Sequence, residues 1–589
     1  MSEAEVPDGF RPVADAADLA EGEPTRVSVD GQPVALVRHE GDAFAVDDRC
    51  PHMGFPLSEG SVDEGVLTCH WHHARFELSG GDTFDPWAND VLAYPVVEAD
   101  GTVYVDPNPD PDRSSPARWR ARLDTGLEEN LRLVVAKAVV GLDDAGVAPT
   151  ETVAQGVDFG TRYRADGWSS GLTILGCLAG VLPDLRPADR RRALYTGLRH
   201  VASDCAGEPP RFDQPALDVR DPDPERLTAW VRENVEVRDR DGAERALRAV
   251  VARCSRDRVE RTLFAAATDH VYLDGGHALD FCNTAIETLD YVGWDDRERV
   301  ADTLASLVPV LVDADRGEEQ SAWRQPVDLA GLLFDAYDDL GLEDRTVAGT
   351  EWTAPDGFDE TLLGDDPRAI VAALRAAVAA GATPVALADR VCHAAASRVA
   401  RFGTANEFGD WNTVHHTFTY ANAVRRAADR VADPRLYRGV FDAALSVYLD
   451  RFLNIPPAPV PEAGASDDDC DPEMLREELL QTFDTEGRVN DAARLVGAHL
   501  DAGADAAALW RTLGRGLLRE DAGFHAIQAY EAGRRQFEAA TTDGERRVAL
   551  VAAARYLAAQ FPTRREAEQT FGIAERLSRG EAVHEEPGK

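Results

Sequence analysis

Apolar and polar residues alternate along the first hundred positions, as they do in strands that bury one face. The stretch RVSVDGQPVALVRHEGDAFAVDD (26–48) sets its apolar residues around the turn sequences DG and EGD, and VLAYPVVEADGTVYVD (91–106) repeats the pattern. We therefore expect residues 9–107 to fold as a small all-β domain. The sequence PNPDPDRSSP cannot continue a sheet and predicts a linker over 108–117.

Beyond this linker the apolar residues recur at spacings of three and four. The pattern, rich in Ala and Arg, predicts helices over 127–142, 188–205, 368–381 and 412–432. The expected order is a helical domain over 118–454, a Pro-rich and acidic linker over 455–472, a helical region over 473–580 that packs on the helical domain, and a disordered tail over 581–589. The predicted fold class is multi-domain, with a small all-β domain before a large, mainly α-helical region.

Charge narrows the expected partners of the chain. Its 589 residues include 62 Lys and Arg against 105 Asp and Glu, a formal net charge of −43. This balance is typical of a halophilic surface and disfavours binding to nucleic acid or anionic membranes, although an ordinary acidic protein stays an alternative. The longest apolar stretch, GLTILGCLAGVL (171–182), is too short to cross a bilayer. We expect a cytoplasmic protein without a membrane span.

Six Cys and His residues gather in CPHMGFPLSEGSVDEGVLTCHWHH (50–73). Cys50 and His52 form a C-x-H motif, sixteen residues follow, and Cys69 and His72 form C-x-x-H. Such spacing is typical of metal ligands. Structural zinc accepts the same residue types, but zinc fingers pair two Cys first and two His second. Here each motif carries one of each, which favours a cluster that bridges two irons.

This arrangement resembles the Rieske [2Fe–2S] signature, in which two thiolates hold one iron and two imidazoles hold the other. The resemblance covers about residues 9–107. It implies that Cys50 and Cys69 bind one iron, that His52 and His72 bind the second, and that the domain transfers electrons.

Departures from the Rieske pattern are informative too. High-potential members of the family carry an additional Cys in each ligand loop, joined as a disulfide, whereas this chain has Phe55 and His70 near those positions. The resemblance therefore implies the low-potential, ferredoxin-like class. His70 replaces the usual proline after the second cysteine and His73 replaces the usual glycine beside the last ligand, and we expect both to be bystanders.

Histidines in the helical region are candidates for a second site. The catalytic candidates are His270, His277, His415 and His525, and a second metal in this region is one interpretation of them. The alternative is that they are core or surface histidines, and no E-x-x-H motif accompanies them. A ring-hydroxylating oxygenase would need two His about five residues apart. His270 and His277 are seven apart across a Gly-Gly break, in a context that predicts helix.

Two segments are more polar and aromatic than a packed helix requires: HVYLDGGHALDFCNTAIETLDYVGW (270–294) and NEFGDWNTVHHTFTYANAV (406–424). They resemble the histidine-containing helical segments of questin-oxidase-like proteins, which oxidatively open aromatic rings. In each, the Asp before the helical pattern, Asp274 or Asp410, could serve as an N-cap instead.

The predicted function is a Rieske-type one-electron carrier that feeds a fused helical oxidase-like or oxygenase-like domain of unknown substrate. Its expected partners are an electron donor, either a ferredoxin or a flavin reductase, and a small-molecule substrate or acceptor. Two alternatives stay open. The chain could be a non-catalytic electron carrier with a helical interaction scaffold, or it could be a redox or iron sensor.

Overall fold

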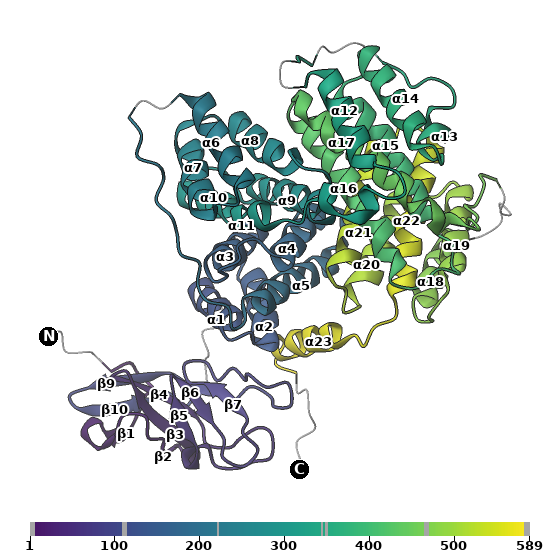
Figure 1. Cartoon of the computed structure of the whole chain (residues 1–589). Coiled ribbons are helices and arrows are strands. Elements are labelled where there is room, and N and C mark those ends of the chain that lie inside the picture. Colours follow the sequence, from purple (N-terminus) through teal and green to yellow (C-terminus); the bar gives the residue numbers. More distant parts are fainter. Residues whose placement is uncertain are drawn as a thin grey trace. The chain divides into compact units, whose positions relative to one another are not determined.

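The computed structural model describes residues 6–108, 115–220, 223–342, 345–347, 352–464 and 471–581. The chain divides into two compact units, Met1–Thr152 with Ala567–Lys589, and Val153–Glu566. Figure 1 shows the strands near the N-terminus and helices along the rest of the chain. The predicted fold class, a small all-β domain followed by a mainly helical region, is confirmed.

Ten short strands make up the β domain within the described residues 6–108. They are β1 (Arg11–Asp15), β2 (Thr25–Val29), β3 (Gln32–His39), β4 (Asp42–Asp47), β5 (Ser61–Asp63), β6 (Val66–Thr68), β7 (Arg75–Glu77), β8 (Ala93–Tyr94), β9 (Val96–Ala99) and β10 (Thr102–Val105). Three antiparallel sheets result, with strand orders β1-β10-β9, β2-β3-β4-β8 and β5-β6-β7.

Alternating residues of these strands build two apolar cores. In β3, Val34 and Leu36 join one core and Ala35 and Val37 join the other, because successive side chains of a strand point to opposite faces. The core that contains Val37 also contains Cys50 and Cys69. Both ligand loops are thus anchored from inside the domain.

The remainder of the described chain is helical. The helices are α1 (Pro116–Glu128), α2 (Arg132–Asp144), α3 (Pro149–Arg162), α4 (Ser170–Val181), α5 (Pro187–Cys205), α6 (Pro224–Glu236), α7 (Arg240–Arg253), α8 (Arg256–Thr268), α9 (His277–Val292), α10 (Arg297–Ala305), α11 (Val308–Asp313), α12 (Leu329–Leu340), α13 (Phe358–Leu362), α14 (Pro367–Ala379), α15 (Pro384–Ala400), α16 (Asp410–Arg430), α17 (Tyr437–Leu449), α18 (Pro472–Thr482), α19 (Val489–Asp501), α20 (Ala506–Leu518), α21 (Phe524–Ala539), α22 (Asp543–Gln560) and α23 (Glu566–Ser578).

Most predicted helices are found within two residues of their expected ends, but the stretch 127–142 is not one helix. Helix α1 ends at Glu128 and α2 begins at Arg132. Between them Asn130 adopts a left-handed conformation with φ of 51°, which ends a right-handed helix and which Asn tolerates better than most residues. The local apolar pattern continued across this break, so the pattern did not reveal it.

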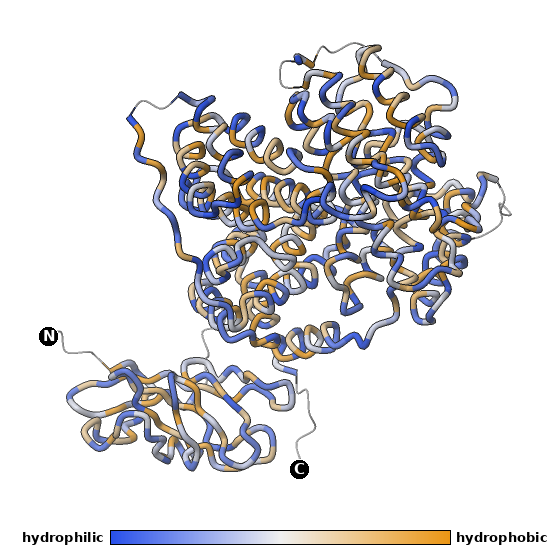
Figure 2. Tube along the Cα trace, in the orientation of Figure 1, coloured by the Kyte–Doolittle hydropathy of each residue, from blue (hydrophilic) through white to orange (hydrophobic). Residues whose placement is uncertain are grey.

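Hydrophilic and hydrophobic residues mix along the helices in Figure 2. This is the pattern of helices that bury one side and expose another. No described helix combines the length and the apolar character needed to cross a membrane. Parts of both predicted linkers, 109–114 and 465–470, and the tail 582–589 lie outside the described residues, so the domain boundaries stay predictions.

Candidate functional site

The first ligand loop follows β4 and turns sharply around Cys50. The Cys50 N–H donates to the carbonyl of Phe55 (2.9 Å), and the Gly54 N–H donates to the carbonyl of Cys50 (2.7 Å). Gly54 has φ of 80°, a left-handed conformation that glycine adopts without strain. Two short hydrogen bonds therefore fix the loop around its cysteine.

The second ligand loop joins β6 to β7 and repeats this pattern. The Cys69 N–H donates to the carbonyl of Ala74 (2.9 Å), and the His73 N–H donates to the carbonyl of Cys69 (2.9 Å). His73 occupies the position of Gly54 and is left-handed as well, with φ of 61°. The unusual histidine noted in the sequence thus stands where the backbone favours glycine.

His73→Gly is expected to stabilise the β domain by about 1 kcal/mol, because the substitution removes the cost of a left-handed non-glycine residue. The measurement is the denaturant midpoint of the cluster-loaded protein. His70→Gly is the matched control, since His70 is also exposed but is not left-handed, and it is expected to be neutral or destabilising. Equal effects of the two substitutions would contradict the strain at His73.

Burial separates the candidate cysteine ligands from the candidate histidine ligands. Cys50 and Cys69 are 2% and 1% exposed, whereas His72 is exposed and His52 is half-buried. The His52 and His72 ring centroids lie 4.9 Å apart. The thiols thus lie inside the domain and the imidazoles lie toward solvent, as expected for a cluster with one iron inside and one outside.

The chemistry of the thiols fits a metal cluster. Burial raises the pKa of Cys50 to about 11, and the neighbouring Cys69 adds to the shift. Both cysteines are free thiols. Two adjacent buried thiols that form no disulfide are costly to ionise, and bound metal provides the positive charge that stabilises them as thiolates.

Donor spacing singles out a second group of residues. In the part of the chain that the structure describes, three possible metal-binding atoms lie within 4.8 Å of one another at His277, His416 and His525, which form a helical cluster.

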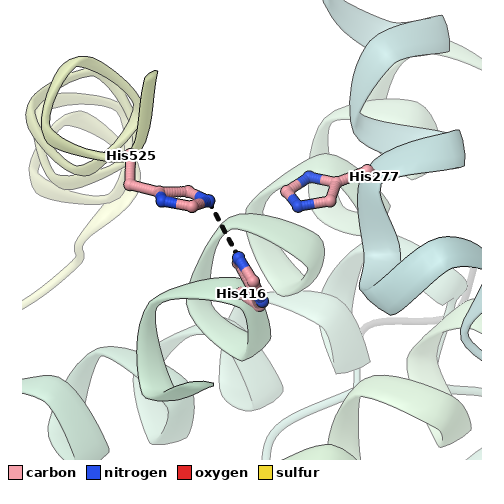
Figure 3. Close-up of side chains that lie close together, drawn as sticks. All are labelled: His277, His416 and His525. Carbon is pink, nitrogen blue, oxygen red and sulfur yellow. Dashed lines mark hydrogen bonds between the residues drawn. The ribbon is translucent and has the colours of Figure 1, made fainter. Parts of the chain in front are cut away.

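The three histidines of this helical cluster come from three helices. His277 is the first residue of α9, His416 lies in the second turn of α16, and His525 is the second residue of α21. Figure 3 shows the three rings pointing toward one another. The Nε2 atoms of His416 and His525 are 2.9 Å apart, and the ring centroids of His277 and His416 are 4.7 Å apart.

The backbone before α9 sets the direction of His277. Gly276 has φ of 95°, and a Cβ placed there would lie 2.7 Å from the Cβ of Tyr420 on α16. A glycine is needed at position 276 because α16 approaches the turn too closely for any side chain.

The N-caps of the two helices are both glycines, Gly276 for α9 and Gly409 for α16. The hypothesis that Asp274 and Asp410 cap these helices is therefore wrong.

The cluster histidines are uncharged at neutral pH. Burial lowers the pKa of His277 to about 3 and that of His416 to about 4, and burial also lowers the pKa of His525. In addition, His277 and His525 lie at helix N-termini, where the helix dipole disfavours a positive charge. Neutral imidazole is the form that binds metals. All three rings are half-buried, so the cluster is accessible from solvent.

A buried ionic network holds the three helices in register. Arg426 of α16 pairs with Glu287 of α9 and, at 2.6 Å, with Glu531 of α21, which also accepts from Arg535 at 2.9 Å. Helix α16 packs against both α9 and α21. Because charges removed from water need close partners, this network favours one relative placement of the helices, and with it one placement of the histidines.

A second polar contact links α9 and α21, one turn beyond the cluster residues His277 and His525. Asp280 of α9 accepts a hydrogen bond from Gln528 of α21. Burial raises the pKa of Asp280 to about 8, so the group is largely protonated at neutral pH. This neutral pair adds a further link between α9 and α21 without adding a ligand to the cluster.

The four sequence candidates are placed differently. His277 and His525 belong to the cluster. His270 instead contacts Glu318 and Glu236, each at 2.6 Å, and the hydrogen bond to Glu318 raises its pKa although burial opposes the shift. His415 is fully buried with its ring 4.7 Å from Tyr556, and it lies outside the group of three.

His416 was not among those candidates. It directly follows His415, and neighbouring residues of a helix point about 100° apart. Which of the two faces α9 and α21 depends on the rotation of α16, which tertiary packing sets. The HH pair itself was the available signal.

Comparison with known proteins identifies the family of the β domain. Residues 9–95 match the family model described as "Rieske [2Fe-2S] domain". The chain is 42% identical over 74 residues to the 3-phenylpropionate/cinnamic acid dioxygenase ferredoxin subunit of Photorhabdus laumondii, covering 12% of this chain and 70% of the relative. It is 37% identical over 92 residues to the p-cumate 2,3-dioxygenase system ferredoxin component of Pseudomonas putida, covering 15% of this chain and 78% of the relative.

A longer relative shares the same segment. The chain is 37% identical over 73 residues to apoptosis-inducing factor 3 of Mus musculus, which covers 12% of this chain and 12% of the relative. The chain thus spans about an eighth of that protein. The reported similarities lie in the β domain, and they leave the helical cluster to be interpreted from its geometry.

Proposed function

We propose that this chain, which belongs to the Rieske [2Fe–2S] domain family through residues 9–95, is an oxidoreductase component with two metal centres. Its β domain carries one electron at a time. Its helical unit, Val153–Glu566, holds a metal ion on His277, His416 and His525. The convergence of three neutral imidazoles on one point carries the proposal for the second centre. The second centre makes the helical unit the oxidase-like or oxygenase-like part.

In the β domain, Cys50 and Cys69 would hold one iron of the cluster and His52 and His72 would hold the other. When bound, the cluster supplies reversible one-electron transfer. The burial of the thiols and the exposure of His72 support this assignment. Exchange with another protein then occurs at the imidazole side.

The electron donor is proposed from the relatives. Two of them are named as ferredoxin components of dioxygenase systems, and we carry this carrier role over to the β domain. The donor would be a ferredoxin or a flavin reductase. Phe55 and His70 stand near the positions where high-potential members carry bracing cysteines, which supports a low-potential carrier.

The helical centre is suited to bind a small molecule at its metal. Three protein ligands leave coordination positions open, as in catalytic metal sites. Phe281 and Phe524 lie beside His277, with ring centroids 5.7 Å and 5.3 Å from it. They provide an apolar wall that limits water and suits an apolar substrate or dioxygen.

Joining both centres in one chain supports transfer between them. A tether holds the two units at a high effective concentration, so that transfer does not depend on protein concentration. A first-order rate that is independent of concentration is therefore the expected signature of the proposal.

Reoxidation of the reduced protein by dioxygen tests this function. We expect the visible absorption of the cluster to recover with a fast first-order phase that does not change with protein concentration. His416→Ala is expected to remove this phase without changing the spectrum of the cluster. His270→Gln is the matched control and should keep it. An equal rate in all three proteins would reject the proposal and favour the non-catalytic carrier with a helical scaffold.

The acidic surface is part of the proposal. A net charge of −43 keeps a protein soluble where salt screens charges, which supports a halophilic origin. In molar salt the screening length is about 3 Å, so recognition of the reductase would depend on shape and apolar contact.

A further inference from the structure

One pocket of the helical unit is lined by several positively charged side chains. It has a volume of about 440 Å³ and lies among the end of α15, the residues after α13 and the turn Asp450–Asn454. Its lining residues are Leu363, Gly364, Asp365, Arg398, Arg401, Arg451, Phe452, Asn454, Ile455 and Pro457. Pockets of this size bind cofactors and small metabolites.

Three arginines line this pocket without a carboxylate partner. Within the described residues, no Asp or Glu oxygen lies within 4.0 Å of the guanidinium nitrogens of Arg398, Arg401 or Arg451. Many other arginines of this acidic chain do have such partners; Arg390, for example, contacts both Asp359 and Glu545. Three arginines in one pocket, none of them with a carboxylate of the described residues at ion-pair distance, point to an anionic ligand.

Arg398 provides a fixed buried charge. It is 6% exposed, and its donors bind the Val447 carbonyl (3.1 Å), the Asn454 Oδ1 (3.0 Å) and the Leu363 carbonyl (2.9 Å). Burial lowers its pKa to about 10, so it remains a cation at neutral pH. Its neighbour Asp450 has a pKa raised to about 7 by burial and is a weak counter-ion.

Arg451 and Arg401 are the groups able to contact a ligand. The Arg451 guanidinium lies 3.9 Å from the Tyr448 ring centroid and 4.0 Å from that of Phe452, and it donates to the Tyr448 carbonyl at 3.0 Å. It is therefore held in place before any ligand binds. Arg401 is exposed, and its side chain forms no hydrogen bond to another described residue.

The rim of the pocket is apolar. Phe452 and Ile455 are 61% and 65% exposed, so both present apolar surface to solvent at the rim. A flat ring could pack on Phe452 while its anionic group meets the guanidinium groups. Asp365 is the one carboxylate among the lining residues, which leaves a net formal charge of about +2 from three arginines and one aspartate.

We propose that this pocket binds a nucleotide-class anion, with a phosphate group on Arg401 and Arg451 and a planar ring against Phe452. The planar fork of arginine matches phosphate in a bidentate manner, and a dianion balances the charge of the pocket. This site is separate from the histidine cluster and does not depend on the function proposed for it.

Isothermal titration of the cluster-loaded full chain tests the site, with AMP, adenosine and inorganic phosphate as probes in a phosphate-free buffer. We expect AMP to bind more tightly than either other probe. Arg401→Gln is expected to weaken AMP about tenfold or more, the loss typical of a charge-assisted hydrogen-bonded pair. Phe452→Ala should weaken AMP and leave inorganic phosphate unchanged. Arg494→Gln, an exposed arginine of α19 outside the pocket, should bind AMP like the natural chain.

Several results would overturn the site. Absence of AMP binding, or equal binding of AMP and adenosine, would exclude a phosphate contact. Inorganic phosphate as tight as AMP would exclude the ring contact. Wild-type affinity in Arg401→Gln would exclude this pocket. Because Arg401 is exposed, its replacement should leave folding intact, and an unchanged melting temperature checks this.

Discussion

Cys50→Ser is expected to lose two irons and two acid-labile sulfides per chain, together with the visible absorption and the reduced-state EPR signal of the cluster. The buried Cys50 thiol would hold the inner iron as a thiolate, and a serine hydroxyl is a far weaker and harder ligand. Metal analysis, sulfide analysis and EPR provide the readout. This is the largest effect that we expect from one substitution.

Two controls separate loss of the ligand from loss of the fold. Cys282→Ser alters an equally buried free thiol on α9 and should keep both irons. His70→Ala should keep the cluster while His72→Ala loses it, although both residues are exposed in the same loop. A Cys50→Ser protein with unchanged EPR would refute the ligand assignment, and zinc in place of iron in the natural chain would revive the zinc alternative.

His416→Ala is expected to remove a metal ion from the helical unit and to leave the [2Fe–2S] cluster intact. Loss of one of three ligands should weaken metal affinity by more than the roughly 10–100-fold cost of losing an outer-shell partner. The measurement is total metal per chain after reconstitution with ferrous iron, followed by competition with a chelator. His277→Ala and His525→Ala should have the same effect.

His270→Gln is the matched control for this metal site. His270 is a half-buried histidine of the same unit, but it contacts Glu318 and Glu236, so its replacement should leave the metal content unchanged. If the natural chain binds no metal beyond its cluster, the close approach of His416 and His525 is a hydrogen bond between two neutral imidazoles. The helical unit would then have no metal centre.

The two sites differ in how far the sequence predicted them. In the β domain, Cys50 to His52 and Cys69 to His72 are short local motifs, and each sits in a loop fixed by its own backbone hydrogen bonds. The sequence therefore predicted these four ligands without knowledge of the fold. It also marked His73 as unusual, and the left-handed backbone at this residue shows why glycine would be favoured there.

The helical cluster could not be found in this way. His277, His416 and His525 are separated by more than a hundred residues at each step, and no motif connects them. The sequence suggested two of the three, and it also suggested His270 and His415, which lie outside the group. No local motif marks Gly276 or Arg426, because their roles depend on how α16 packs against α9 and α21.

The sequence by itself determined the order of a β domain and a helical region, the Rieske character of the N-terminal domain and the acidic composition of the chain, and it predicted four ligands for the N-terminal cluster. Local spacing and composition decide each of these. Tertiary structure alone decided which histidines meet and which arginines share a pocket, because both depend on the rotation and packing of helices that are distant in the chain.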